Sequence, residues 1–220
     1  MASLSKYFIK DDNCTIARKD TIFQGLKYRI TILTERLVRL EYNEKGIFED
    51  IPTQLVINRN FEKPVFSVKE TNNSLEIKTK YFILNYAKEK PFKGSKLMPG
   101  KNLTIRLRNS ERFWYYNHPE VRNFKGAAYS FDLDKHGFKV EKGLYSTDGF
   151  ATINDTGNPV FVADGSVKKN PSDGIDIYLF IYRKDFGKAL KSYFELTGYP
   201  GLIPSYALGV WWNKNEEYNE

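Results

Sequence analysis

Side chains able to act as acids, bases or metal ligands are dispersed along this 220-residue chain. Asp132 and Asp134 have the alternate spacing found in calcium loops, and Asp155 follows in the same loop-rich region. A calcium loop also needs a glycine and a later glutamate at fixed positions, and these are absent, so we interpret the three residues as solvated loop acids. His118 and His136 are far apart and have no cysteine neighbours. We therefore predict no metal site and no cofactor.

Covalent catalysis has no recognisable motif in this sequence either. Ser146 and Ser166 lack the strand–turn–helix context of a nucleophile elbow. Gly157 and Gly165 stand alone, so no glycine-rich phosphate loop is present. Cys14 is the single cysteine, which excludes an intrachain disulfide and a cysteine metal cluster. We predict no catalytic residue within these 220 residues.

Aromatic residues make up 15% of the chain, an excess that favours strands and can also supply rings that stack on sugars. The Phe-Trp-Tyr-Tyr run at residues 113–116 is the best candidate for an exposed sugar-binding platform. Packing of these rings in a core is the interpretation that we favour.

Most of the elements that would position a site are predicted to be strands. Alternation in Tyr28–Thr34 places Tyr28, Ile30 and Ile32 on one face, and this strand should form a hairpin with Leu37–Tyr42. Closely spaced strands with Gly, Pro and Asn between them are typical of a β-sandwich rather than of βαβ units. Further strands are predicted at residues 54–57, 65–70, 75–79, 82–86 and 103–107.

The later part of the chain combines long loops with one strong strand. Residues 120–164 predict irregular loops, and binding contacts often lie on such loops. Residues 175–182 are apolar on both faces, which predicts a central strand. Short strands are expected within the loop region at residues 138–140, 151–154 and 160–162.

One helix is predicted after Asp185, which can cap its amino terminus. Gly198 provides a left-handed stop, and Pro200 prevents continuation. The residues that follow helical spacing on one side, and that we expect to pack on the sandwich, are Phe186, Leu190, Tyr193, Phe194 and Thr197.

The net charge of +7 comes from scattered lysines, whereas nucleic-acid binders usually cluster their charge. We interpret the denser spots, residues 88–96 and 168–169, as solvated loops and predict no nucleic-acid partner. The first residues lack the apolar run of a signal peptide, and no apolar stretch approaches the roughly 20 residues that cross a bilayer. A cytoplasmic location without membrane contact is the resulting prediction.

Several motifs resemble glycoside hydrolase family 31, in the order in which that family has them. Residues 39–50, followed by Pro52-Thr53, look like the early signature of its bacterial members. Residues 143–155 resemble a loop that many members spell Gly-Leu-Leu-Ser-Arg-Asp-Gly-Trp. Residues 173–180 and 196–200 also match, and residues 206–212 are similar to the first barrel strand. The resemblance runs from about Tyr28 to the end of the chain.

This resemblance implies an all-β, mutarotase-like β-sandwich with one carboxyl-terminal helix, placed ahead of a (β/α)₈ barrel. We expect the sandwich at residues 1–199, and the linker with the start of a truncated barrel at residues 200–220. Family members are retaining enzymes with a carboxylate nucleophile and an acid/base. Their two catalytic aspartates lie on later barrel strands, so this chain alone should be inactive.

The resemblance assigns a possible substrate contact to Asp148. In family members an acidic group on a sandwich loop can reach over the barrel mouth, and a carboxylate can accept two sugar hydroxyl hydrogen bonds. The alternative, which we favour, is an Asx turn ahead of Gly149. Thr147 replaces the arginine common at its position, so any ionic partner that the arginine would give is lost.

Trp212 and Asn213, with Trp211, end the segment that resembles the first barrel strand. One of them would line the sugar pocket under the family interpretation. The alternative is that the tryptophans fill the seam between barrel and sandwich, and without a barrel they would form an exposed apolar patch.

The function predicted is a non-catalytic domain of an α-glucosidase or α-xylosidase that supports the downstream barrel and lends a loop to the sugar pocket. Its partners would be that barrel and α-linked glucosides or oligosaccharides. A stand-alone carbohydrate-binding module is the alternative. An aldose epimerase is a third interpretation, but its acid–base pair needs a well-placed histidine, and neither histidine here has a convincing setting.

Overall fold

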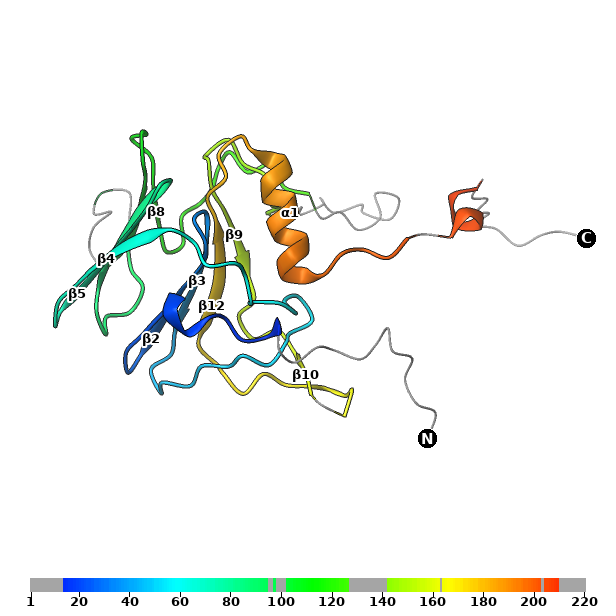
Figure 1. Cartoon of the computed structure of the whole chain (residues 1–220), viewed down its shortest axis with the longest axis horizontal. Coiled ribbons are helices and arrows are strands. Elements are labelled where there is room, and N and C mark those ends of the chain that lie inside the picture. The colour runs from blue at the N-terminus through cyan, green and yellow to red at the C-terminus, as the bar shows by residue number, and fades with distance from the viewer. Residues whose placement is uncertain are drawn as a thin grey trace, which may run out of the picture.

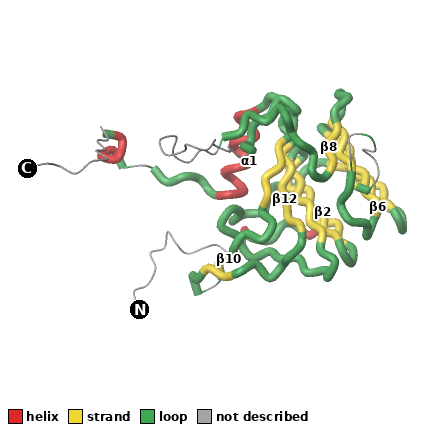
Figure 2. The backbone as a smooth tube through the Cα atoms, turned by 180° about the vertical axis from the view of Figure 1, so that it is seen from behind, coloured by secondary structure: helices red, strands yellow, loops and turns green. Residues whose placement is uncertain are grey.

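Two five-stranded antiparallel sheets pack face to face in the computed structural model, and one helix covers the outer face of the first sheet (Figure 1). The structure describes residues 14–94, 97, 102–126, 142–162, 164–202 and 204–209. The all-β sandwich with a single carboxyl-terminal helix that the sequence predicts is confirmed. In the view from behind, the strands fill the body and long loops surround them (Figure 2).

The first sheet brings together strands from both ends of the chain. It has the order β1-β2-β3-β12-β9, and a short 3₁₀ turn at Lys19–Thr21 leads into it. The predicted central position of the strand near residue 177 is confirmed, because β12 pairs with β3 on one side and β9 on the other. Its strands are β1 (Ile22–Gln24), β2 (Tyr28–Thr34), β3 (Leu37–Tyr42), β9 (Ala151–Asn154) and β12 (Ile175–Phe180).

The second sheet is a simple meander in which each strand pairs with the next along the chain. Its strands are β4 (Phe66–Glu70), β5 (Ser74–Thr79), β6 (Phe82–Ala87), β7 (Leu103–Leu107) and β8 (Phe113–Tyr115). A small separate hairpin joins β10 (Val160–Phe161) and β11 (Val167–Lys168). The predicted hairpin of β2 and β3 is also present.

Period-two alternation in the sequence explains the core between the sheets. In β2 the side chains of Tyr28, Ile30 and Ile32 point inward, as predicted, and all three are buried. Leu75 and Ile77 meet them from β5. At about 25 cal/mol for each Å² of apolar surface removed from water, this core is the main stabilising element of the sandwich.

A second core lies on the other face of the first sheet. Tyr178 and Phe180, the residues of β12 that point away from the inner core, pack there against α1 (Phe186–Thr197) and the loop that includes Val56 and Phe61. This arrangement explains why β12 is apolar on both faces: each face is covered by another layer.

The face of α1 that packs on the sheet differs in part from the predicted one. Its buried residues are Ala189, Ser192 and Leu196, whereas Leu190 is 36% exposed. Small side chains lie at the contact because they let the helix approach the large Phe180 and Tyr182 rings of the sheet. Tyr193 packs against this core as predicted, with its ring centroid 6.3 Å from that of Phe180. Phe186 and Phe194 lie beside the contact.

The predicted signals at the ends of α1 are confirmed in position but not in every detail. Asp185 is the residue before the helix, yet its carboxylate makes no capping hydrogen bond and instead pairs with Arg36 at 2.9 Å. Gly198 ends the helix with φ +93°, and a Cβ there would lie 2.8 Å from Ile57 Cδ1. A side chain at this position would meet both strain and a clash.

Two predicted strands are corrected. Residues 54–57 form a loop, because their backbone bonds go to Pro159 and Leu196 rather than to a neighbouring strand. Ser205–Leu208 forms a 3₁₀ turn where a barrel strand was expected from residue 206. The expected strand at residues 138–140 lies outside the described residues. Among the helices that the structure describes, none has the length and apolar composition of a membrane span.

Candidate functional site

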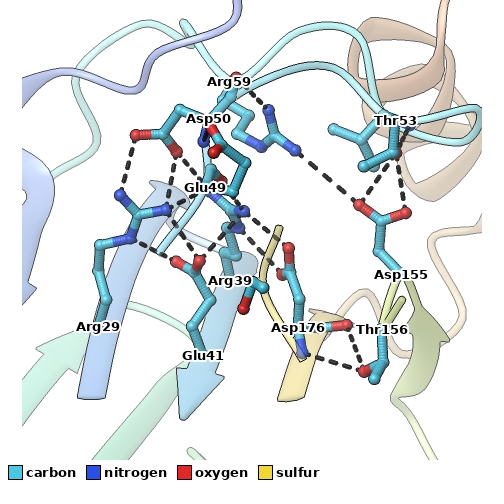
Figure 3. A network of polar contacts seen from close by, with 12 residues as sticks. Arg29, Arg39, Glu41, Glu49, Asp50, Thr53, Arg59, Asp155, Thr156 and Asp176 are labelled. Atoms are coloured by element: carbon cyan, nitrogen blue, oxygen red, sulfur yellow. Dashed lines mark hydrogen bonds and ion pairs between the residues drawn. The ribbon is translucent and has the colours of Figure 1, made fainter. Parts of the chain in front are cut away.

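Charged side chains gather on the outer face of the first sheet, under the loop that follows β3 (Figure 3). Arg29 on β2 and Arg39 and Glu41 on β3 alternate with core residues, so their side chains point away from the inner core. Asp176 joins them from β12, and Asp50 comes down from the covering loop. Alternation of strand residues thus places four charged groups in one layer, and the loop adds the fifth.

Short contacts join these groups into a continuous network. Arg29 donates two hydrogen bonds to Glu41, at 2.6 and 2.8 Å. Arg39 donates to both oxygens of Asp176, at 3.0 and 2.7 Å. Both guanidiniums also reach Asp50, at 2.8 and 2.7 Å. Paired, two-pronged contacts of this kind fix the geometry of both partners.

Arg59 and Asp155 form the less complete corner of the network. Asp155 accepts hydrogen bonds from Thr53 Oγ1 and Asn158 Nδ2, each at 2.8 Å. Arg59 Nε donates to the hydroxyl of Tyr178 at 2.7 Å. Arg59 Nη2 is 3.9 Å from Asp155 and has no hydrogen-bond partner among the described residues. With this corner included, three guanidiniums face four carboxyl groups.

The excess of acids and their burial shift the pKa values of the carboxyl groups. Burial raises the pKa of Asp155 to about 6, and the neighbouring Asp176 carboxylate adds to the effect. Burial also raises the pKa of Glu41 to about 7, against the pull of Arg39 and Arg29. The pKa of Asp50 is lowered, because the two arginines outweigh its burial.

Carboxyl groups with pKa values in this range have the acidity of catalytic acids. Glu41 and Asp155 are however only 3% and 0% exposed. A substrate atom cannot reach them without opening the loop above. The arrangement therefore ties the loop to the sheet and offers no accessible acid–base pair.

Three motifs that the sequence singled out meet in this network. Residues 39–50 supply Arg39, Glu41 and Asp50, residues 143–155 supply Asp155, and residues 173–180 supply Asp176 and Tyr178. Segments far apart in the chain are thus joined by their charged residues.

Asp148 lies in the loop before β9 and is 8% exposed. Its Oδ2 accepts a hydrogen bond from the backbone N–H of Arg122 at 3.1 Å, which links two loops. Its own N–H donates to Ser146 Oγ at 3.0 Å. Gly149 has φ +90°, and its backbone N–H closes the turn by a hydrogen bond to the carbonyl of Ser146. The carboxylate therefore bridges loops, and the expected Asx turn is not formed.

Glu120 is a buried acid near Asp148 that the sequence did not single out. It is 3% exposed and has φ +49°, a left-handed conformation that is unusual for a glutamate. Its Oε2 accepts long hydrogen bonds from the Thr152 N–H and the Asn123 amide, at 3.4 and 3.5 Å. Its Oε1 has no partner among the described residues. Burial raises the pKa of Glu120.

His118 lies beside Glu120 but is held by packing and by one hydrogen bond. Its ring contacts Tyr115 and Phe150, with centroids 4.8 and 4.9 Å away, and its Nδ1 accepts from the N–H of Glu120 at 3.0 Å. Burial lowers the pKa of His118, and the nearby Asp148 carboxylate opposes this shift. The histidine is therefore a neutral packing residue at pH 7.

The remaining sequence candidates fall into two groups. The aromatic cluster at residues 113–116 is no open platform, since Trp114 is buried and donates to Thr152 Oγ1 at 3.0 Å. Within the described residues, no group of three His, Cys, Asp or Glu side chains could hold a metal ion. The candidates that lie outside the described residues are Asp132, Asp134, His136, Trp211, Trp212 and Asn213.

One feature of the sequence indicates the buried network: charged residues on strands that are covered on both faces. Leu37–Tyr42 has charged residues at alternate positions and Tyr28–Thr34 has one, Arg29, yet both strands belong to a sheet that is covered on both faces. An arginine facing a covering layer needs a carboxylate partner. For Glu120 no such pattern exists, because its loop has no periodicity.

Comparison with known proteins adds little to this picture. No protein-family model and no curated protein matches the chain. The fold is similar to a GH31 dextranase of Flavobacterium johnsoniae in complex with glucose, with 18% identity and a TM-score of 0.44. A mutant of that dextranase in complex with isomaltotriose is similar as well, with 19% identity and a TM-score of 0.44. Each comparison covers 86% of this chain and 28% of the dextranase chain. A likeness of this degree says nothing about activity.

Proposed function

We propose that this chain is the non-catalytic amino-terminal β-sandwich of a retaining, α-glucosidase-type glycoside hydrolase. The sandwich would take residues 1–199, and residues 200–220 would lead into the catalytic barrel. The observation that carries the proposal is the convergence of three family-like motifs on one buried network. These motifs stabilise the sandwich, so the chain can resemble the amino-terminal domain of the family although it contains no catalytic group.

An apolar seam along α1 supports a role in carrying a further domain. We define the α1 seam as Phe124, Phe186, Leu190, Phe194 and Tyr199. Ring centroids of Phe124 and Phe186 are 5.8 Å apart at one end, and those of Phe194 and Tyr199 are 5.7 Å apart at the other. Phe186, Leu190 and Phe194 follow each other at four-residue spacing, so they share one side of the helix.

The α1 seam is exposed to the degree expected of an interface whose partner domain is missing. Phe124 is 58% exposed and Tyr199 is 66% exposed. Leu202 is fully exposed in the segment that leads away from the sandwich (Figures 1 and 2). Contiguous apolar surface is seldom left uncovered on a soluble domain. A barrel that follows residue 200 would begin next to this surface.

For substrate binding we retain Asp148 as the proposed contact. Its Oδ2 is engaged with Arg122, whereas Oδ1 makes no hydrogen bond with the described residues, which leaves one oxygen for a sugar hydroxyl. A carboxylate fixed at one oxygen is well positioned for such a contact. The proposed roles of Trp212 and Asn213 at the sugar pocket rest on the family resemblance alone.

The direct test is hydrolysis of p-nitrophenyl α-glucoside and maltose by this chain and by the same chain extended through its native downstream sequence. We expect activity only in the extended protein. Activity in the 220 residues alone would overturn the proposal, because the described carboxyl groups with raised pKa values are buried.

The substrate contact is tested in the extended protein with Asp148→Asn. The amide can still accept from the Arg122 N–H, so the loop contact is kept while the charge is lost. We expect a raised KM for maltose of about tenfold, as for the loss of one charge-assisted hydrogen bond. Asp164→Asn, at an exposed turn, is the matched control. An unchanged KM in Asp148→Asn would remove this residue from the site.

The α1 seam is tested by Leu190→Ser, with the exposed neighbour Lys191→Ser as its control. In the 220-residue chain both variants should unfold close to the wild type, because neither side chain is in the core. In the extended protein Leu190→Ser should lower the unfolding temperature and Lys191→Ser should not. Equal behaviour of the two variants there would contradict a barrel contact at the α1 seam.

A further inference from the structure

The outward face of the second sheet carries a straight row of polar side chains. In the register of the sheet, Lys69 on β4 lies opposite Glu76 on β5, and Glu76 lies opposite Asn85 on β6. Neighbouring strands are about 4.8 Å apart, which is close to the length of one sugar ring along a glucan chain. The three side chains therefore present polar groups at a regular spacing across the sheet.

A groove of about 350 Å³ follows this row. Its volume is at the lower end of that of small-ligand sites. The polar side chains that line it, besides the row, are Asn73, Ser74 and Asn102. Asn102 donates through Nδ2 to the carbonyl of Pro91 at 2.7 Å, which fixes the amide and leaves its oxygen as an acceptor.

Two side chains of the row are uncommitted. Within the described part of the chain, Lys69 and Asn85 make no hydrogen bond or ion pair with another side chain, whereas Glu76 pairs with Lys78 at 2.8 Å. The polar groups of Lys69 and Asn85 are therefore available to a ligand without the displacement of a side-chain partner.

The backbone under the groove is already paired. β5 has β4 on one side and β6 on the other, and β6 has β7 beyond it. A peptide therefore cannot add a strand in this groove, because no free backbone edge faces it. Recognition must use the side chains, on a base that the sheet holds rigid.

The two charged side chains that line the groove have opposite signs, and Lys78 pairs with the acidic one. Lys69 and Glu76 contribute one charge of each sign among the lining residues. A phosphate or a uronate would meet the Glu76 carboxylate, and a cation would meet the Lys69 ammonium. Amide, hydroxyl, ammonium and carboxylate groups around one groove match a neutral ligand with many hydroxyls, which both donate and accept.

We propose that the groove on β4, β5 and β6 is a binding site for a neutral oligosaccharide, separate from any active site. Its polar row would contact successive sugar rings, with Glu76 at the centre and Asn85 at one end as both donor and acceptor. The groove belongs to the second sheet, whereas α1 and its seam cover the first sheet (Figure 1). The site therefore does not depend on the function proposed above.

The test is isothermal titration of the whole 220-residue chain with maltohexaose, isomaltohexaose and cellohexaose. We expect at least one of these hexasaccharides to bind, and hexagalacturonate not to bind. Asn85→Ala should weaken the binding by at least about fivefold, as expected for the loss of hydrogen bonds from one amide. Glu76→Gln, which keeps the shape of the side chain, should weaken it as well.

Asn60→Ala is the matched control, because Asn60 is an exposed amide in the loop beside α1, away from the groove. It should leave the affinity unchanged. The proposal is overturned if none of the neutral hexasaccharides binds, if Asn85→Ala binds as tightly as the wild type, or if hexagalacturonate binds better than the neutral sugars. Unchanged thermal unfolding of Asn85→Ala would show that a loss of affinity is not a loss of fold.

Discussion

Two buried acidic regions of the sandwich differ in how their charge is balanced. In the network under the loop after β3, Glu41 is bonded to Arg29 and Asp176 to Arg39, at distances of 3.0 Å or less. In the loops before β9, Glu120 is as deeply buried, yet it has no guanidinium partner, and one of its oxygens has no hydrogen bond to the described residues.

The difference lies in the origin of the two regions. Strand alternation places arginines and carboxylates of the network on neighbouring strands, and the register of β2, β3 and β12 brings them together. The loop around Glu120 has no register, and the hydrogen bonds that Glu120 accepts from the Asn123 amide and the Thr152 N–H are long. Lys142 acts on Glu120 from nearby, but burial outweighs it and raises the pKa of this acid. The two regions should therefore respond oppositely to charge removal.

The largest effect is expected from Arg39→Met. The variant keeps the packing volume but leaves Glu41, Asp50 and Asp176 with one guanidinium fewer in a buried layer. Removal of one partner from a buried ion pair costs about 3–5 kcal/mol of unfolding free energy. Urea unfolding followed by tryptophan fluorescence measures the loss.

Arg18→Met is the control for this prediction. Arg18 pairs with Asp20 at 3.2 Å on the surface, where solvent screens the pair. It should leave the urea midpoint unchanged. If Arg39→Met also unfolded at the wild-type midpoint, the network would not be what holds the loop to the sheet.

The second prediction concerns the corner of the network at Asp155. Its pKa is raised by burial to about 6, whereas in the unfolded chain an aspartate titrates near its ordinary value. Between these two pKa values the folded protein holds a proton that the unfolded chain has released, so this group's contribution to stability falls as pH rises. Below the unfolded value the contribution is fully present.

Asp155→Asn isolates that contribution. The difference in unfolding free energy between wild type and variant should fall by about 2 kcal/mol as the pH rises from about 4 to about 6.5. Urea titrations at several pH values measure it. A difference that stays constant, or that grows with pH, would mean that Asp155 is ionised throughout and is compensated by Arg59.

The sandwich itself could be predicted because its strands alternate strictly. Tyr28, Ile30 and Ile32 take the inner face as expected, and the apolar run around Ile177 is the central strand. The helix face was predicted only in part: Tyr193 packs on the core, but periodicity alone gives large aromatics more weight than the buried Ala189 and Ser192. Close packing against a strand of large rings selects small residues, which a hydrophobic pattern does not reveal.

The site could be predicted only where its charged residues lie on the same strand. The motif at residues 39–50 was visible, but the partners of Arg39 come from β12 and from a loop, so their meeting depends on long-range register. Glu120 was not visible at all, because its burial results from the packing of two irregular loops. Asp148 was correctly placed in a loop, yet its bond to Arg122 is also set by that packing.

A smaller effect, of opposite sign to the first, is expected from Glu120→Gln. The glutamine amide keeps an acceptor for the Thr152 N–H. It is neutral at every pH, so the folded protein has neither to bury a carboxylate nor to keep this acid protonated. Because burial raises the pKa of Glu120, the ionised form is disfavoured in the folded protein, and the penalty grows as pH rises. We expect a gain of about 1 kcal/mol at pH 8, from relief of one buried unpaired group.

The gain of Glu120→Gln should shrink at pH 4, where the acid is protonated in both states. Glu111→Gln, at a turn beside β8, changes the same charge without burial and serves as the matched control. Destabilisation by Glu120→Gln at pH 8 would reveal a cation partner for this carboxylate, and the contrast between the two buried regions would then fail.

The smallest effect is expected at a surface pair whose geometry matches that of the network. Lys45 lies 2.5 Å from Asp173, closer than any contact of Arg39, but both side chains are more than half exposed. Solvent screening and the entropy of two mobile side chains cancel the attraction. Lys45→Ala should therefore leave the urea midpoint unchanged at low and at high salt. A salt-sensitive loss in this variant would mean that distance, rather than burial, decides what a charged pair contributes in this sandwich.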